Sequence, residues 1–66
     1  MFQVSHKEGK TLLDFSQVSI CDADTVGKAI NACRLAGPRN TQIIGANDHV
    51  REVLEILGVN MFADIV

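Results

Sequence analysis

The 66-residue chain contains no tryptophan or tyrosine, and phenylalanine occurs only three times. Its six basic residues are scattered, and the formal net charge is −2. A nucleic-acid-binding domain usually has a basic stripe, and aromatic rings on that stripe stack on the bases. Because both features are missing, we expect no binding to nucleic acid.

Long hydrophobic runs are absent too. The longest uninterrupted apolar runs span only a few residues, whereas a membrane-spanning helix needs about 20. The first six residues, Met-Phe-Gln-Val-Ser-His, lack the charged and apolar regions of a signal peptide. We therefore expect a cytoplasmic protein that does not insert into a membrane.

Motifs for metal binding and redox chemistry are missing from the sequence. The only cysteines, Cys21 and Cys33, belong to no Cys-x-x-Cys motif, and both histidines lie far from them. We favour reduced, buried thiols for both cysteines. A disulfide between the two is the alternative. Asp22 and Asp24 offer carboxylates, but no further ligands follow at the spacing of a calcium loop. We expect no metal and no cofactor.

No catalytic grouping is visible either. His6 and His49 carry no local motif that would orient them as a base for a serine or threonine nucleophile. We therefore expect that the chain is not an enzyme.

What the chain does contain is a series of short apolar patterns typical of strands. Residues 2–5 alternate, residues 11–15 are more continuously apolar, and a polar turn with Gly9 between them predicts a hairpin. A further strand is expected at 41–46, and a short strand or packing segment at 61–66. Val18–Cys21 is also interpreted as the end of an apolar strand that leads into an acidic turn.

Two helices are predicted from apolar residues at helical spacing. The first follows Asp22 or Asp24 as N-cap and ends at Gly37, and the second follows Asn47 or Asp48 and ends at Gly58. Leu35 lies off the apolar stripe of the first helix and is a candidate exposed contact. The stripes comprise Val26, Ala29, Ile30 and Cys33 in the first helix, and Val50, Val53, Leu54 and Leu57 in the second.

The predicted order is strand, strand, helix, strand, helix, strand. Strands separated by helices imply right-handed parallel crossovers with the helices packed on the sheet. Residues 1–66 are therefore expected to form one α/β domain, a small mixed sheet of about four strands with two helices.

Three stretches follow one another in the order and spacing of a known domain family. They are Leu12-Leu-Asp-Phe-Ser-Gln-Val-Ser-Ile-Cys-Asp22, Arg34-Leu-Ala-Gly37, and Ile43-Ile-Gly45 with Val50-Arg-Glu-Val-Leu-Glu-Ile-Leu-Gly-Val59. Through them the chain from Lys10 onward, about four-fifths of the sequence, resembles the STAS family, the sulphate-transporter and anti-sigma-factor-antagonist domain. The first stretch resembles the family's central strand running into its Asp, the second the end of the following helix, and the third its next strand and helix.

The resemblance implies a noncatalytic regulatory module that binds a protein such as an anti-sigma factor or kinase. In the family, the residue after the Asp is typically a Ser or Thr whose phosphorylation releases the partner. Here that residue is Ala23, and Thr25 is the nearest phosphate acceptor. The helix after Asp22 is about one turn shorter than in the family. Residues 1–9 replace the family's N-terminal strands and first helix.

The acidic turn is accordingly the predicted site. We expect a partner to dock on Asp22, Ala23, Asp24 and Thr25 and on Lys28 and Leu35 of the following helix. The alternative is a small-ligand or nucleotide-binding domain that uses the helix N-termini after Asp22 and Gly45. The short chain and the missing N-terminal cover also predict a homodimer.

Overall fold

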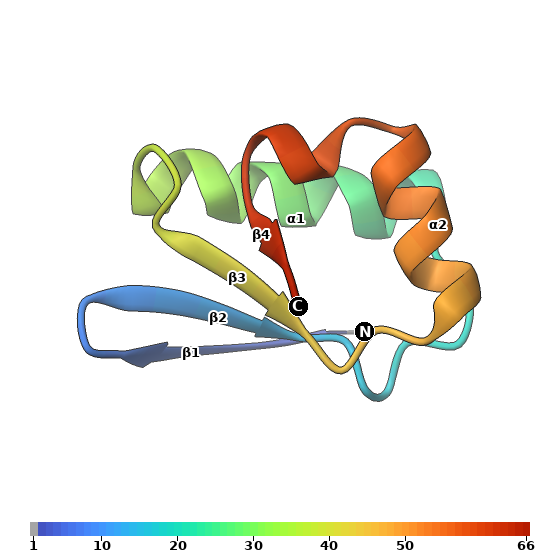
Figure 1. Cartoon of the computed structure of the whole chain (residues 1–66), viewed down its shortest axis with the longest axis horizontal. Helices are drawn as coiled ribbons and strands as arrows, with labels where there is room; N and C mark the ends of the chain where they lie inside the picture. Colours follow the sequence, from blue (N-terminus) through green and yellow to red (C-terminus); the bar gives the residue numbers. More distant parts are fainter. Residues whose placement is uncertain (1) are drawn as a thin grey trace.

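Four strands form one mixed sheet, and two helices pack on one of its faces in the computed structural model, which describes residues 2–66 (Figure 1). The sheet order is β1-β2-β3-β4, which is also the order of the strands in the sequence. This arrangement confirms a small α/β fold with a four-stranded mixed sheet and two helices.

A tight hairpin joins the first two strands. β1 (Gln3–Lys7) pairs antiparallel with β2 (Lys10–Asp14), and Lys7 lies opposite Lys10. The two loop residues, Glu8 and Gly9, have φ angles of 53° and 80°. Two consecutive positive φ angles match the right-handed twist of a hairpin, and glycine takes such an angle without strain. The predicted hairpin is confirmed.

The other strands are joined through the helices. β3 (Thr41–Ile44) pairs parallel with β2, and β4 (Asp64–Ile65) pairs parallel with β3. Each crossover moves one strand further in the same direction, so two right-handed crossovers place both helices on the same face.

The prediction of an apolar strand ending at Val18–Cys21 was wrong. β2 ends at Asp14, whose Oδ1 accepts a hydrogen bond from the Ser16 amide at 2.9 Å. The Val18 amide then donates to the Phe15 carbonyl at 2.9 Å, which closes a turn. Val18 packs into the core from this loop, whereas Ile20 is 75% exposed. The apolar residues therefore belong to a loop, because these turn hydrogen bonds replace those of a strand.

The first helix, α1 (Ala23–Ala36), follows the prediction closely. Asp22 is the N-cap, since its side chain accepts from the Thr25 amide. The helix ends at Gly37, whose φ of 92° few other residues adopt easily. The predicted stripe faces the sheet: Val26, Ala29 and Cys33 are buried and Ile30 is partly buried.

The second helix, α2 (Asp48–Ile56), also has the predicted ends. Asn47 is the N-cap and accepts from the Val50 amide at 2.8 Å. Leu57 is the C-cap, and Gly58 follows it with a φ of 81°. Leu57 still donates to the Val53 carbonyl at 3.0 Å but is 53% exposed, contrary to its predicted place in the apolar stripe. A 3-10 turn, η1 (Val59–Met61), then leads into β4.

The core lies between the sheet and the helices. Its largest fully buried side chains are Phe15, Leu13, Ile43, Leu54, Val50 and Val59. Phe2 extends this core at the N-terminal end, where its ring stacks on Phe15 with centroids 4.9 Å apart. Of residues 2–66, no helix combines the length and the apolar character that a membrane crossing requires.

Candidate functional site

The predicted acidic turn is the N-terminus of α1. Asp22 Oδ1 accepts from the Thr25 amide at 2.9 Å, and its backbone carbonyl accepts from the Val26 amide at 3.0 Å. The Thr25 amide, and next the Thr25 hydroxyl, hold the pKa of Asp22 below its usual value because they donate to the charged carboxylate. The side chain of Asp22 therefore caps α1.

Asp24 and Lys28 form the exposed part of this turn. Lys28 Nζ lies 3.2 Å from Asp24 Oδ2, one helical turn away, and both side chains are more than half exposed. Such a pair contributes only about 0.3–0.5 kcal/mol. A partner could therefore replace this contact with its own at little cost in stability.

Ala23 and Thr25 have opposite surroundings. Ala23 is exposed at the first position of the helix, whereas Thr25 is only 9% exposed. Ala23, where the STAS resemblance would place a hydroxyl, is therefore exposed but has none, and Thr25, the nearest residue with a hydroxyl, is buried. A kinase could reach Thr25 only if the first turn of α1 opened.

Leu35 lies at the other end of α1 from the acidic turn. With a rise of 1.5 Å per residue, it is about 16 Å along the helix axis from Asp24. The spacing i, i+4, i+7 and i+11 nevertheless places Asp24, Lys28, Asn31 and Leu35 on one side of the helix. All four are exposed, and Leu35 is 82% exposed. We call these four residues the α1 stripe.

Two residues near the predicted site were missed from the sequence. Asn31 belongs to the α1 stripe, and counting in steps of three and four from Asp24 would have found it. Ile20, 75% exposed just before the turn, was assigned to a strand and so was not considered as a surface residue.

Neither helix N-terminus is open to an anion. Asp22 caps α1 and Asn47 caps α2, so each cap already accepts an amide hydrogen bond. The first turns also contain Asp24 and Asp48, respectively. Negative charge at these positions already compensates the positive ends of the helices and repels a phosphate.

The cysteines do not form a redox or metal site. Both are free thiols, and burial raises the pKa of each. A raised pKa lowers the thiolate fraction and with it the reactivity. Residues 2–66 contain no group of three or more His, Cys, Asp or Glu side chains that could hold a metal ion.

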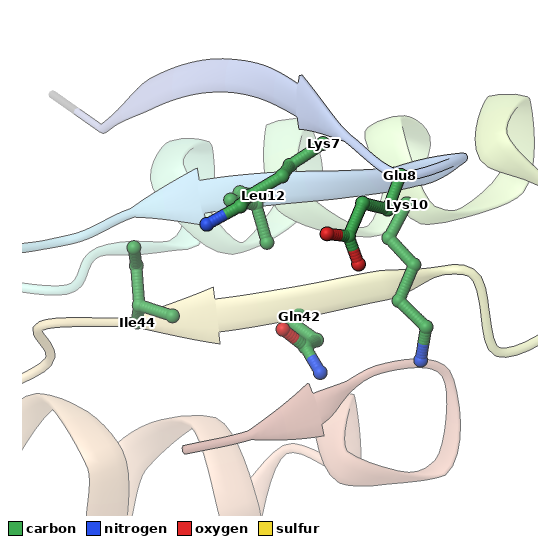
Figure 2. Close-up of a pocket in the computed structure, with 6 residues that line it drawn as sticks. All are labelled: Lys7, Glu8, Lys10, Leu12, Gln42 and Ile44. Atoms are coloured by element: carbon green, nitrogen blue, oxygen red, sulfur yellow. The ribbon is translucent and has the colours of Figure 1, made fainter.

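A hollow lies on the face of the sheet opposite the helices (Figure 2). Its side chains come from the β1–β2 hairpin and from β3, and Figure 2 shows them projecting from the strands on the side away from α1. The hollow combines two lysines with one glutamate and has an aliphatic floor. It is lined by Lys7, Glu8, Lys10, Leu12, Gln42 and Ile44.

Comparisons of the chain with protein-family models, with curated proteins and with solved structures find no match. The fold and the geometry of α1 are therefore the basis for a functional proposal.

Proposed function

We propose that the protein is a noncatalytic regulatory module that docks a partner protein on the acidic turn and the α1 stripe. The observation that carries the proposal is the stripe itself. It presents a carboxylate, an ammonium group, an amide and an aliphatic side chain along one exposed side of a 14-residue helix. Mixed polar and apolar groups of this kind are usual in helices that bind protein surfaces.

The class of partner follows from the STAS-like pattern of the sequence. On this proposal the partner is a cytoplasmic anti-sigma factor or kinase, and the protein acts as its antagonist. The observed loop between β2 and Asp22 departs from the strand that this pattern implied. The four-stranded sheet with two helices remains compatible with a shortened STAS-like domain.

Control of docking by phosphate is proposed at Thr25. A phosphate on this side chain would carry charge into a turn that already contains Asp22 and Asp24. It would also disturb the hydrogen bond from the Thr25 amide to Asp22, because the side chain is buried beside it. Modification would therefore open the first turn of α1 and release the partner.

The test is a charge reversal that leaves the helix cap intact. We expect Asp24→Lys combined with Lys28→Asp to weaken binding of a candidate anti-sigma factor or kinase at least about tenfold, measured by calorimetry. The fold should persist, because the salt bridge is exposed and its charges are only exchanged. Asp22 is left unchanged, since its replacement would also remove the N-cap.

The matched control exchanges a second exposed ion pair, Arg39→Asp combined with Asp64→Arg. This pair lies outside α1, and the exchange, like the first, leaves the net charge unchanged. Equal loss of affinity in both double variants would show an effect that does not depend on the α1 stripe. Unchanged affinity in the folded α1 double variant would contradict the proposal.

A small-ligand or nucleotide-binding function at the helix N-termini is the alternative to this proposal. It predicts saturable changes in the NMR chemical shifts of the amides at Thr25–Gly27 or Asn47–His49 when nucleotides or inorganic phosphate are added. The caps and the carboxylates in both first turns oppose it. We therefore expect no saturable shifts in either segment.

The surface of the molecule also supports self-association. Several large hydrophobic side chains are exposed, among them Leu35, Ile56 and Met61, and a small domain gains stability when such surfaces are covered. We propose a homodimer, which light scattering at micromolar concentration tests directly. A monomer under these conditions would contradict it.

A further inference from the structure

β1 is an uncovered edge of the sheet. All five of its residues, Gln3–Lys7, are exposed, and it pairs only with β2. An edge strand presents unpaired amide and carbonyl groups to which another strand can bind. The opposite edge, β4, has only two residues, so β1 is the longer free edge.

The hairpin determines which peptide groups of β1 point outward. Lys7 and Lys10 flank a two-residue loop, and residues in that position exchange hydrogen bonds with each other. Hydrogen-bonded and non-hydrogen-bonded pairs alternate along an antiparallel ladder. Val4 and His6 are therefore the residues whose amide and carbonyl groups face the free edge.

A mainly apolar groove runs beside this edge. On one side it is formed by β1, where Val4 is 52% exposed, and on the other by the C-terminal part of α1, where Leu35 is 82% exposed. A second strand along β1 would extend the wall of this groove and cover part of its apolar lining. The groove is lined by Val4, His6, Thr11, Ala32, Leu35 and Ala36.

We propose that a second copy of the chain binds here, with the two β1 strands antiparallel about a twofold axis at Ser5. This inference names the surface used in the proposed self-association and rests on it. Val4 of each copy lies opposite His6 of the partner subunit, and each such pair exchanges two hydrogen bonds. The result is a continuous eight-stranded sheet with all the helices on one face.

The charges of β1 suit this register. Lys7 lies opposite Gln3 of the partner subunit, so no two charges of the same sign face each other across the strands. An axis at His6 would instead bring two imidazoles together and place Val4 against the turn residue Glu8. An axis at Val4 would require Phe2, which lies outside the strand and stacks on Phe15.

Cysteine cross-linking tests the register. In a Cys21→Ser background, Ser5→Cys should form a disulfide-linked dimer on mild oxidation. Residues on the axis form a non-hydrogen-bonded pair with Cα atoms about 4.5 Å apart, within the range that a disulfide spans. Gln3→Cys is the matched control, because its two copies would be about 13 Å apart. We expect at least about tenfold more covalent dimer from Ser5→Cys. Equal yields would overturn the proposal.

A proline substitution tests the hydrogen bonds. His6→Pro removes an outward amide without breaking the β1–β2 ladder, and proline is tolerated on edge strands. His6→Ala is the control, because it also removes the imidazole but keeps the amide. Sedimentation equilibrium should give a dimer dissociation constant at least about tenfold higher for His6→Pro than for His6→Ala. Equal constants would overturn the proposal.

The outcomes separate this inference from the self-association on which it rests. A wild-type chain that stays monomeric would contradict both. A wild-type dimer that Ser5→Cys does not cross-link would retain self-association and overturn the β1 interface. A dimer cross-linked at Ser5 supports both.

Discussion

At the scale of single residues, two aspartates that accept local hydrogen bonds make the stability of the protein depend on pH. Amide and hydroxyl donors of Thr25 lower the pKa of Asp22, and those of Ser16 lower the pKa of Asp14, from an ordinary value of 3.8. A group whose folded-state pKa is depressed stabilises the fold above its unfolded-state pKa. That contribution is lost as the pH falls through the folded-state value.

We therefore expect the melting temperature to fall as the pH is lowered below about 5. Asp22→Asn should reduce this dependence, because an asparagine caps a helix well but does not titrate in this range. The measurement is the difference in melting temperature between pH 6 and pH 3. A difference as large in Asp22→Asn as in the wild type would show that the Asp22 cap contributes nothing to it.

Thr41 offers a second prediction at the residue scale. Its side chain is fully buried, and within residues 2–66 its hydroxyl has no hydrogen-bond partner. Burial raises the pKa of the Cys33 thiol, and the Thr41 hydroxyl opposes part of this effect. No hydrogen bond joins the two groups, so the Thr41 hydroxyl counts as unpaired.

An unpaired buried hydroxyl costs about 1–3 kcal/mol. Thr41→Val keeps the shape of the side chain and removes the hydroxyl, so it should raise the free energy of unfolding by about 1 kcal/mol. Urea denaturation measures the change. A loss of stability would show that the hydroxyl makes a favourable contact with Cys33.

At the scale of elements, α1 contains a glycine, Gly27, at a position where the helix does not need one. Gly27 is exposed in the interior of the helix, and a Cβ atom there would meet nothing within 4 Å. Glycine at such a position costs about 1 kcal/mol relative to alanine. Gly27→Ala should therefore raise the free energy of unfolding by about this amount in urea denaturation. A decrease would mean that the helix is strained at this position.

The helices were the elements best predicted from the sequence, because their caps are local. Asp22, Asn47 and Gly37 act within one turn of their positions, so their roles follow from spacing alone. The loop after β2 could not be predicted in this way. Val18 is as apolar as a strand residue, but the Asp14–Ser16 hydrogen bond ends the strand first. An Asp side chain can accept a hydrogen bond from the backbone amide two residues later, and this turn signal was obscured by the apolar pattern.

At the scale of the whole molecule, the sheet is covered on one face only. Both crossovers run in the same direction, so the helices lie on one face (Figure 1). Leu12 and Ile44 lie on the opposite face and are only partly buried (Figure 2). The sequence predicted the order of the elements but not this one-sidedness. The reason is that the direction of each crossover depends on strand pairing, which residue patterns do not specify. The same pairing determines that β1 is a free edge.

The candidate site was predicted in part. The acidic turn was located correctly as a helix N-terminus, because capping is local. Which residues around it are exposed was not predicted correctly, because exposure depends on tertiary packing. Thr25 is buried, whereas Ile20 and Asn31 are exposed. The members of the α1 stripe follow from helical spacing, but their exposure is a property of the folded molecule.

The most direct test of the docking proposal maps the partner's contact surface on the whole chain. Amide shifts of the labelled protein would be followed by NMR while an anti-sigma factor or kinase encoded beside its gene is added. The largest shifts are expected at Ile20, at the acidic turn, and along α1 at Asp24, Lys28, Asn31 and Leu35. Shifts confined to α2, or to the open face around Leu12 and Ile44, would contradict the account.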